Sequence, residues 1–373
     1  MTRSDLPEIK QMLQDQIQSL CANLLPDGKP QGRLWVAHNP VTGDYSQTPE
    51  FKVALTRDVG AWKDWRTGEA GDVLGLIGYI NFSGQKNVRP ALDWARDFLN
   101  LRSMPAEARR EVSQRARQAR EDAAEREARS RLDRMARAEK LFFRGMADGA
   151  GSAPEAFGRR YFAARRVPLE RIANRDLQTF RFAGSQEFWA RAQFRHENGR
   201  PVKVHPGPEY PCIYAAGRLA NGQLSGIHMT YLDPMAPKKL PVAPKKESAK
   251  VMWGPWEGAV IRLSHGPEGE PPETACQAHP LIIGEGIETT ASVAIVAPEA
   301  RAWAGGSLAN MKNAPFWLPC ISTVFLLKDF FKSDTTKQQF AQVVAAVEAA
   351  GKPWVEMDPP DGDGDFNDTM MEG

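Results

Sequence analysis

The pattern of apolar and polar residues changes along the chain, and each change predicts a different kind of structure. Apolar residues recur at helical spacing over residues 1–30, which predicts an amphipathic helix. Over 34–65, short apolar runs are separated by turn residues, and this pattern predicts a small β domain. Two further apolar helices are expected over 72–80 and 90–99.

Residues 105–140 form a long charged segment that mixes acidic and basic residues at three- and four-residue spacing among many alanines. Alanine has the highest helix propensity, and opposite charges one turn apart attract each other, so the segment predicts one long exposed helix. A spacer between domains is the simplest interpretation. The alternative is a basic face that follows a phosphate backbone.

Strands and helices alternate in the C-terminal part of the chain, which predicts βα units on a parallel sheet. The strands are expected at 281–283, 300–303, 323–327 and 354–356, and the helices at 288–296 and 335–350. The sequence therefore predicts a multi-domain α/β protein. Its expected parts are a small β domain over 1–100, a linking helix over 101–144, a mixed α/β middle domain over 145–265 and a parallel-sheet domain over 266–373.

The composition is that of an ordinary globular protein, with 42% hydrophobic and 25% charged residues. Because the formal net charge is only +2, any nucleic-acid-binding surface has to come from local segregation of charge. The cysteines form no C-x-x-C pair, and no apolar stretch approaches the roughly 20 residues that span a bilayer. We expect a soluble, cytoplasmic protein without a signal peptide or a membrane segment.

Two acidic residues closely follow predicted strands: Glu285 after 281–283, and Asp329 after 323–327. In a parallel sheet, ligands bind outside the carboxyl ends of the strands. Carboxylate oxygens suit Mg²⁺ or Mn²⁺, so a metal site is expected at this edge. Further candidate ligands are Asp334, Asp365 and Asp368. The alternatives are that Glu285 only stabilises a helix N-terminus and that the aspartate-rich tail is solvated.

The C-terminal region resembles the Toprim (topoisomerase-primase type) domain of primase-like proteins from plasmids and phages. The motifs that carry the resemblance are LIIGEGIET at 281–289, AGGS at 304–307, FLLKD at 325–329 and GDFND at 364–368. The resemblance implies that Glu285 is the general acid/base and that Asp329 binds Mg²⁺. Phe331 stands where the family has a second aspartate, and Asp334 is the expected substitute.

The resemblance extends towards the N-terminus. Residues 145–265 resemble the domain that precedes Toprim in these mobile-element proteins, and 33–80 resemble a primase zinc ribbon that lacks all of its cysteines. No zinc is therefore expected, because a structural zinc site needs four close ligands. Packing of tryptophan side chains would have to replace the metal.

Basic and aromatic side chains of the ribbon-like region and of a lysine-rich loop are candidates for binding single-stranded DNA through phosphate contacts and base stacking. These residues are Arg33, Lys52, Trp62, Lys63, Trp65, Arg66, Lys238, Lys239, Lys245 and Lys246. The alternatives are a tryptophan mini-core and a solvated loop. His228, within an apolar strand, is expected to be a hydrogen-bonded structural residue.

The resemblance implies a primase-like nucleotidyltransferase that makes primers on single-stranded DNA from nucleoside triphosphates, in the replication of a mobile element. The sequence has no Walker A motif, so a priming enzyme would need either a separate replicative helicase as its partner or a self-sufficient grip on the template. Two alternatives remain open. One is a non-catalytic nucleic-acid-binding protein of a plasmid or phage, and the other is a metal-dependent Toprim nuclease.

Overall fold

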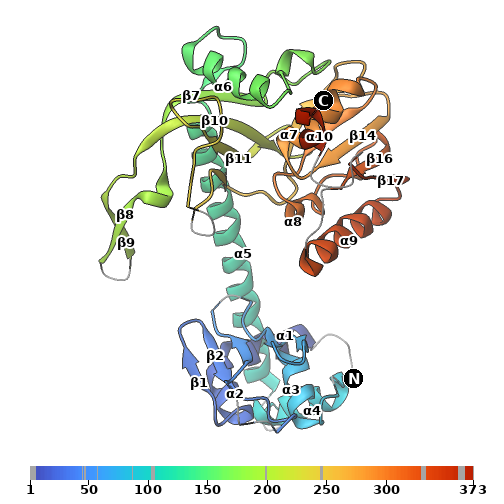
Figure 1. Ribbon diagram of the computed structural model, residues 1–373. Coiled ribbons are helices and arrows are strands. Elements are labelled where there is room, and N and C mark those ends of the chain that lie inside the picture. Colours follow the sequence, from blue (N-terminus) through green and yellow to red (C-terminus); the bar gives the residue numbers. More distant parts are fainter. Residues whose placement is uncertain are drawn as a thin grey trace. The chain divides into compact units, whose positions relative to one another are not determined.

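The computed structural model divides the chain into two compact units, Met1–Ala128 (unit 1) and Arg129–Gly373 (unit 2) (Figure 1). Helix α5 (Ala106–Phe142) contributes residues to both units. It is the long charged helix that the sequence predicts. The structure describes residues 6–43, 45, 48–56, 58–85, 87–101, 106–197, 200–243, 247–328, 333–359 and 366–372.

Unit 1 consists of short helices around a five-stranded antiparallel sheet of order β1-β2-β3-β4-β5. Its strands are β1 (Lys29–Gln31), β2 (Leu34–Ala37), β3 (Phe51–Ala54), β4 (Trp62–Asp64) and β5 (Ala70–Gly71). Its helices are α1 (Leu6–Asp15), α2 (Ile17–Leu24), α3 (Val73–Asn81) and α4 (Val88–Phe98). The expected single N-terminal helix is thus two helices, and their buried residues belong to one core with the sheet.

Hydrogen bonds and aromatic packing connect the turn after β2 to the end of β4. The Asn39 amide donates to Asp64 Oδ2 at 2.6 Å and to the Tyr79 hydroxyl at 2.9 Å. The ring of Trp62 packs on Phe51, with centroids 5.0 Å apart, and on Tyr79, with centroids 4.7 Å apart. The zinc-ribbon resemblance leads us to expect tryptophan packing in place of a metal, and the contacts of Trp62 are packing of this kind.

Unit 2 is built on a ten-stranded mixed sheet, in which the strands β12-β11-β10-β13-β15-β14-β16-β17 follow one another, β7 also pairs with β10, and β6 pairs with β7. The first strands are β6 (Met146–Ala147), β7 (Phe180–Glu187), β10 (Glu209–Arg218), β11 (Leu224–Tyr231), β12 (Lys250–Trp253) and β13 (Val260–Ser264). The parallel strands are β14 (His279–Gly284), β15 (Arg301–Ala304), β16 (Ile321–Leu327) and β17 (Trp354–Met357). A separate hairpin, β8 (Gln193–Glu197) and β9 (Arg200–His205), projects away from this sheet (Figure 1).

The helices of unit 2 pack on this sheet or on one another. They are α6 (Ala153–Ala164), α7 (Ile287–Val296), α8 (Leu308–Met311), α9 (Asp334–Ala349) and α10 (Phe366–Glu372). The predicted alternation of strands and helices in the C-terminal part is confirmed. The strand β7, the hairpin and helices α8 and α10 are additions to the elements expected from the pattern of apolar residues, because their sequences have no clear period.

The middle and C-terminal regions share this one sheet. Strand β13 pairs antiparallel with β10 on one side and with β15 on the other. Ile261, for example, lies opposite Gly217 of β10 and Ala304 of β15. The expected boundary between 145–265 and 266–373 therefore falls inside a continuous sheet.

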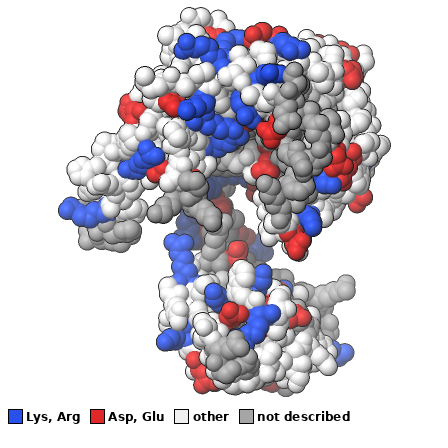
Figure 2. Space-filling model, in the orientation of Figure 1, with Lys and Arg blue, Asp and Glu red and all other residues white. Residues whose placement is uncertain are grey.

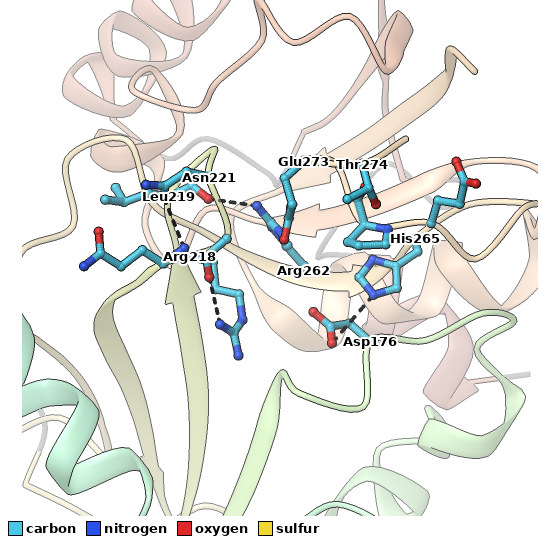
Figure 3. A network of polar contacts seen from close by, with 12 residues as sticks. Asp176, Arg218, Leu219, Asn221, Arg262, His265, Glu273 and Thr274 are labelled. Carbon is cyan, nitrogen blue, oxygen red and sulfur yellow. Dashed lines mark hydrogen bonds and ion pairs between the residues drawn. The ribbon is translucent and has the colours of Figure 1, made fainter. Parts of the chain in front are cut away.

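Polar side chains attach the loop after β13 to the sheet (Figure 3). The buried Arg262 donates to Glu273 Oε2 at 2.6 Å and to the Leu219 carbonyl at 2.8 Å. Nearby, His265 Nε2 lies 3.7 Å from Asp176 Oδ1. Because a buried guanidinium without a partner would cost several kcal/mol, about 3–5, the pairing with Glu273 fixes the course of the loop.

The carboxylate of Asp64 makes the stability of unit 1 depend on pH. Burial alone would raise the pKa of Asp64, but hydrogen bonds from Asn39 and from the Arg66 and Thr67 backbone outweigh it and hold the pKa below its ordinary value of 3.8. A carboxyl group whose pKa is lowered by folding stabilises the folded state above its unfolded pKa. This stabilisation is lost as the pH falls through the lower, folded pKa.

We predict that Asp64→Asn destabilises unit 1 by about 1–3 kcal/mol at pH 7, because a buried acceptor of charge-assisted hydrogen bonds is lost. The difference from the wild type shrinks as the pH falls below the unfolded pKa of about 4, and it is lost below the lower pKa of the folded wild-type carboxylate. Amide hydrogen exchange in β3 and β4, measured at several pH values, tests this. The matched control is Asp27→Asn, at an exposed position. Equal protection in the Asp64 variant and the wild type at pH 7 would contradict the prediction.

Candidate functional site

Glu285 stands at the carboxyl end of β14, in the turn that leads into α7. The backbone of this turn is tied to the turn after β15: Gly305 N–H donates to the Gly284 carbonyl at 2.9 Å, and Gly306 N–H to that of Glu285 at 3.0 Å. A Cβ at Gly284 would lie 2.8 Å from Thr290 Oγ1, so this close approach requires glycine. Glu285 is half-buried. It therefore lies at the edge of the parallel strands where ligands are expected.

Two of the other predicted metal ligands lie outside the described residues, namely Asp329 and Asp365, as does Phe331. Strand β16, which ends two residues before Asp329, is a parallel neighbour of β14. Lys328 at the end of this strand pairs with Glu356 Oε1 of β17 at 2.5 Å.

The remaining two predicted ligands lie on helices. Asp334 is the first residue of α9, is fully exposed to solvent and lies 3.4 Å from Lys337 Nζ. Asp368 lies on α10, 4.0 Å from Arg165. Helix α10 is held against α7, because the buried amide of Asn367 donates to Ser292 Oγ at 3.2 Å.

In the part of the chain that the structure describes, no group of three or more His, Cys, Asp or Glu side chains is close enough to hold a metal ion. A half-buried carboxylate such as Glu285 has the hard oxygen donors that Mg²⁺ prefers. The carboxylate oxygens of Glu285 are thus of the kind that magnesium prefers. Among the predicted ligands that the structure describes, Glu285 is the one at the edge of the parallel strands.

Glu288 is a residue of this region that the sequence analysis did not single out. It lies in the first turn of α7, three residues after Glu285, and is only 5% exposed. Its Oε1 lies 3.1 Å from Lys239 Nζ and accepts a hydrogen bond from Tyr161, and its Oε2 lies 3.0 Å from Lys250 Nζ. Burial would raise the pKa of Glu288, but the two lysines outweigh it and hold the pKa far below its ordinary value. An acidic residue inside an otherwise apolar helix start is the signal that could have identified it.

The predicted lysine-rich loop therefore has two kinds of lysine in its described part. Lys239 points to Glu288, whereas Lys238 lies 3.6 Å from Asp233 and is mainly exposed. Lys245 and Lys246 lie outside the described residues. His228 is buried beside this loop, and burial together with the charge of Lys250 lowers its pKa to about 4. Its Nδ1 lies 3.5 Å from Thr230 Oγ1, which agrees with a structural role.

In unit 1 the ribbon-like sheet brings three of the predicted side chains together. Lys52 of β3 lies opposite Lys63 of β4, and their ammonium groups lie 5.9 Å and 4.1 Å from the ring centroid of Trp65. Trp65 is 60% exposed. Trp62, by contrast, is 3% exposed and packs in the core, so it presents no stacking face. The sequence left open a tryptophan mini-core as an alternative to DNA binding. Trp62 lies in a core of this kind, and Trp65 does not.

The two remaining candidates of unit 1 lie elsewhere on its surface. Arg66 is exposed and lies 3.9 Å from Glu50, and Arg33 is exposed just before β2. In unit 2, Lys and Arg side chains gather on the face drawn in Figure 2, over β10 and β11. Within the described part of the chain, no helix is both long enough and apolar enough to cross a membrane.

Comparison with known families gives two matches. Residues 280–373 match the model of the Toprim domain, so the C-terminal part of the chain is a Toprim domain, as the sequence predicts. The fold and this match define a Toprim-domain protein of mixed α/β structure. Residues 133–263 match a domain of unknown function (DUF7146). A comparison with curated proteins gives no significant match.

Several solved structures of primases are similar to the chain. The Aquifex aeolicus primase (zinc-binding and RNA polymerase domains) is 12% identical, with 100% of this chain and 83% of that chain covered and a TM-score of 0.37. The DnaG primase catalytic domain bound to ssDNA is 16% identical over 66% of this chain and 78% of that chain, with a TM-score of 0.40. The Escherichia coli primase catalytic core is 13% identical over 60% and 71%, with a TM-score of 0.37. These likenesses are too distant to carry conclusions about chemistry.

Proposed function

We propose that this chain is a primase-like nucleotidyltransferase that makes primers on single-stranded DNA from nucleoside triphosphates. The observation that carries the proposal is a Toprim domain in which Glu285 stands at the carboxyl end of β14, beside two parallel strands. A half-buried carboxylate at this edge suits both metal binding and proton transfer. A role in the replication of a plasmid or phage, together with a separate helicase, belongs to the same proposal.

Each acidic residue has a defined part in the proposed reaction. Glu285 takes a proton from the primer 3′-hydroxyl or holds a metal ion. Asp329, together with Asp334 or with Asp365 and Asp368, binds Mg²⁺ or Mn²⁺. The metal, when bound, orients the triphosphate and offsets the negative charge of the departing pyrophosphate.

The cluster of Lys52, Lys63 and Trp65 supports single-stranded DNA as the template. An exposed indole ring stacks on unpaired bases of any sequence, and flanking ammonium groups attract the phosphates. Both features occur on one exposed face of β3 and β4. Arg33, Arg66 and the lysine-rich loop extend the proposed contacts.

One assay separates primer synthesis from the two other functions. The full chain is incubated with single-stranded DNA, labelled nucleoside triphosphates and Mg²⁺ or Mn²⁺. Oligonucleotide products support a primase, and cleavage of the DNA supports a nuclease. A salt-sensitive mobility shift without either product supports a binding protein, which is the outcome that Phe331 in the second aspartate position favours.

We predict that Glu285→Gln reduces primer synthesis by about 10²–10⁴-fold, because the amide can neither accept a proton nor offer an anionic ligand. The affinity for single-stranded DNA stays within about twofold of the wild type, since the proposed lysine–phosphate and stacking contacts lie elsewhere and are unchanged. The matched control is Glu299→Gln, at an exposed position after α7. Wild-type synthesis by the Glu285 variant would exclude Glu285 as the catalytic group.

We also predict that Trp65→Ala weakens binding of single-stranded DNA by about 1–3 kcal/mol, the range for loss of one base–aromatic stack. Lys63→Gln makes the plot of log K against log salt concentration less steep, by about the amount that corresponds to the loss of one phosphate contact. Fluorescence anisotropy over a series of salt concentrations measures both effects. Trp317→Ala, which removes an indole of similar exposure in unit 2, is the control. Equal effects of the two tryptophan substitutions would contradict a specific role for Trp65.

A further inference from the structure

The two lysines that contact Glu288 come from a different part of the sequence than Glu288 itself. Lys239 lies in the loop after β11, and its backbone is fixed by a bridge to Leu232. Lys250 is the first residue of β12. Glu288 belongs to α7, the helix that follows Glu285 in the Toprim domain. This cluster, the Glu288–lysine cluster, therefore joins the middle region to the helix that begins beside Glu285.

The Glu288–lysine cluster carries an excess of positive charge. Two ammonium groups share one carboxylate, and the tyrosine and histidine beside it are neutral at pH 7. Burial raises the pKa of Tyr161, so its hydroxyl stays protonated, and burial lowers the pKa of His228 to about 4, so its ring is uncharged. Arg165, near Tyr161, lies 4.0 Å from Asp368, so these two charges offset each other. A net positive charge thus remains in the Glu288–lysine cluster.

The side chains of the two lysines are also partly exposed to solvent. The side chains of Lys239 and Lys250 are 35% and 34% exposed, whereas the carboxylate beneath them is nearly inaccessible. An ammonium group has three N–H donors, and the bond to Glu288 uses one of them on each lysine. The other donors suit an anion with several oxygen acceptors, such as a phosphate group.

We propose that Lys239 and Lys250 form a phosphate-binding site and that Glu288 is its positioning residue, which holds both ammonium groups in place from below. The inference rests on the proposed function, because it assigns this site to a phosphate of the nucleotide or of the DNA strand. Glu288 does not touch the phosphate. It acts by fixing two flexible side chains that would otherwise have to be ordered when the ligand binds.

Binding of inorganic pyrophosphate to the full chain tests the site without any requirement for catalysis. Isothermal titration is carried out at pH 7 and low salt, without divalent metal. We expect Lys239→Gln and Lys250→Gln each to weaken binding at least tenfold. Lys312→Gln is the control, because Lys312 is an exposed lysine of unit 2 that donates to Gln342 and belongs to none of the proposed sites; it stays within about twofold of the wild type. Equal affinities of all three variants and the wild type would overturn the proposed site.

Glu288→Gln distinguishes positioning from simple charge. This substitution makes the cluster more positive, so charge alone would tighten pyrophosphate binding, whereas loss of positioning weakens it. We expect binding to weaken about tenfold, and tighter binding would overturn the positioning role. Tyr161→Phe, which removes one hydrogen bond to Glu288 and no charge, is expected to weaken binding a few-fold. If thermal unfolding shows that the Glu288 variant does not fold, Tyr161→Phe still tests the positioning role of Glu288.

Two further titrations identify the source of the phosphate. If the lysine variants lose affinity for a nucleoside triphosphate but not for single-stranded DNA, the site binds the nucleotide; the reverse result assigns it to the strand. If the lysine variants bind both ligands as tightly as the wild type does, the assignment of this site to a phosphate of the nucleotide or of the DNA strand is overturned. Pyrophosphate binding requires no catalysis, so a wild-type chain that binds pyrophosphate but makes no primers would contradict only the proposed enzyme activity.

Discussion

The pairing of β13 with strands on both of its sides is the constraint on which the rest of unit 2 depends. Its backbone joins the antiparallel strands β10 and β11 to the parallel strands β14 to β17 in one sheet. Because every inner strand of such a sheet satisfies its backbone on both edges, the two regions cannot separate without exposing unpaired N–H and C=O groups. The middle region is therefore part of the framework of the Toprim domain in this chain.

This shared sheet explains why charged groups from distant parts of the sequence meet beside Glu285. Helix α7 packs against the sheet next to β13 and β15, and its first turn carries Glu288. Strands β11 and β12 carry the lysine loop to the same helix. Burying a carboxylate is costly, and two ammonium groups with a tyrosine hydroxyl offset that cost. Loss of both lysines would leave the buried carboxylate of Glu288 as an unpaired charge.

In unit 1, hydrogen bonds and aromatic packing hold the turns of the small sheet together. The Asn39–Asp64–Tyr79 hydrogen bonds and the buried ring of Trp62 occupy the space between these turns. The side chains of Phe51, Trp62 and Tyr79 belong to the hydrophobic core that the sheet and the helices of unit 1 share. Trp35 and Trp62 are buried in this core, whereas Trp65 is exposed beside Lys52 and Lys63.

The sequence by itself determined the helices and strands in which apolar residues recur at a clear period. It also determined which candidate site residues follow the ends of those strands. The apolar runs before Glu285 and Asp329, the charged helix and the Toprim motifs all depend on local spacing, which is legible without a fold. Local pattern could not place β7 or the boundary of the middle region, because strand pairing joins residues that are far apart in sequence. Only the tertiary structure decided that Trp62 is buried while Trp65 is exposed, and that Lys239 and Lys250 meet at Glu288. Burial and charge pairing are properties of the packed chain, so no spacing of residues along the sequence contains them.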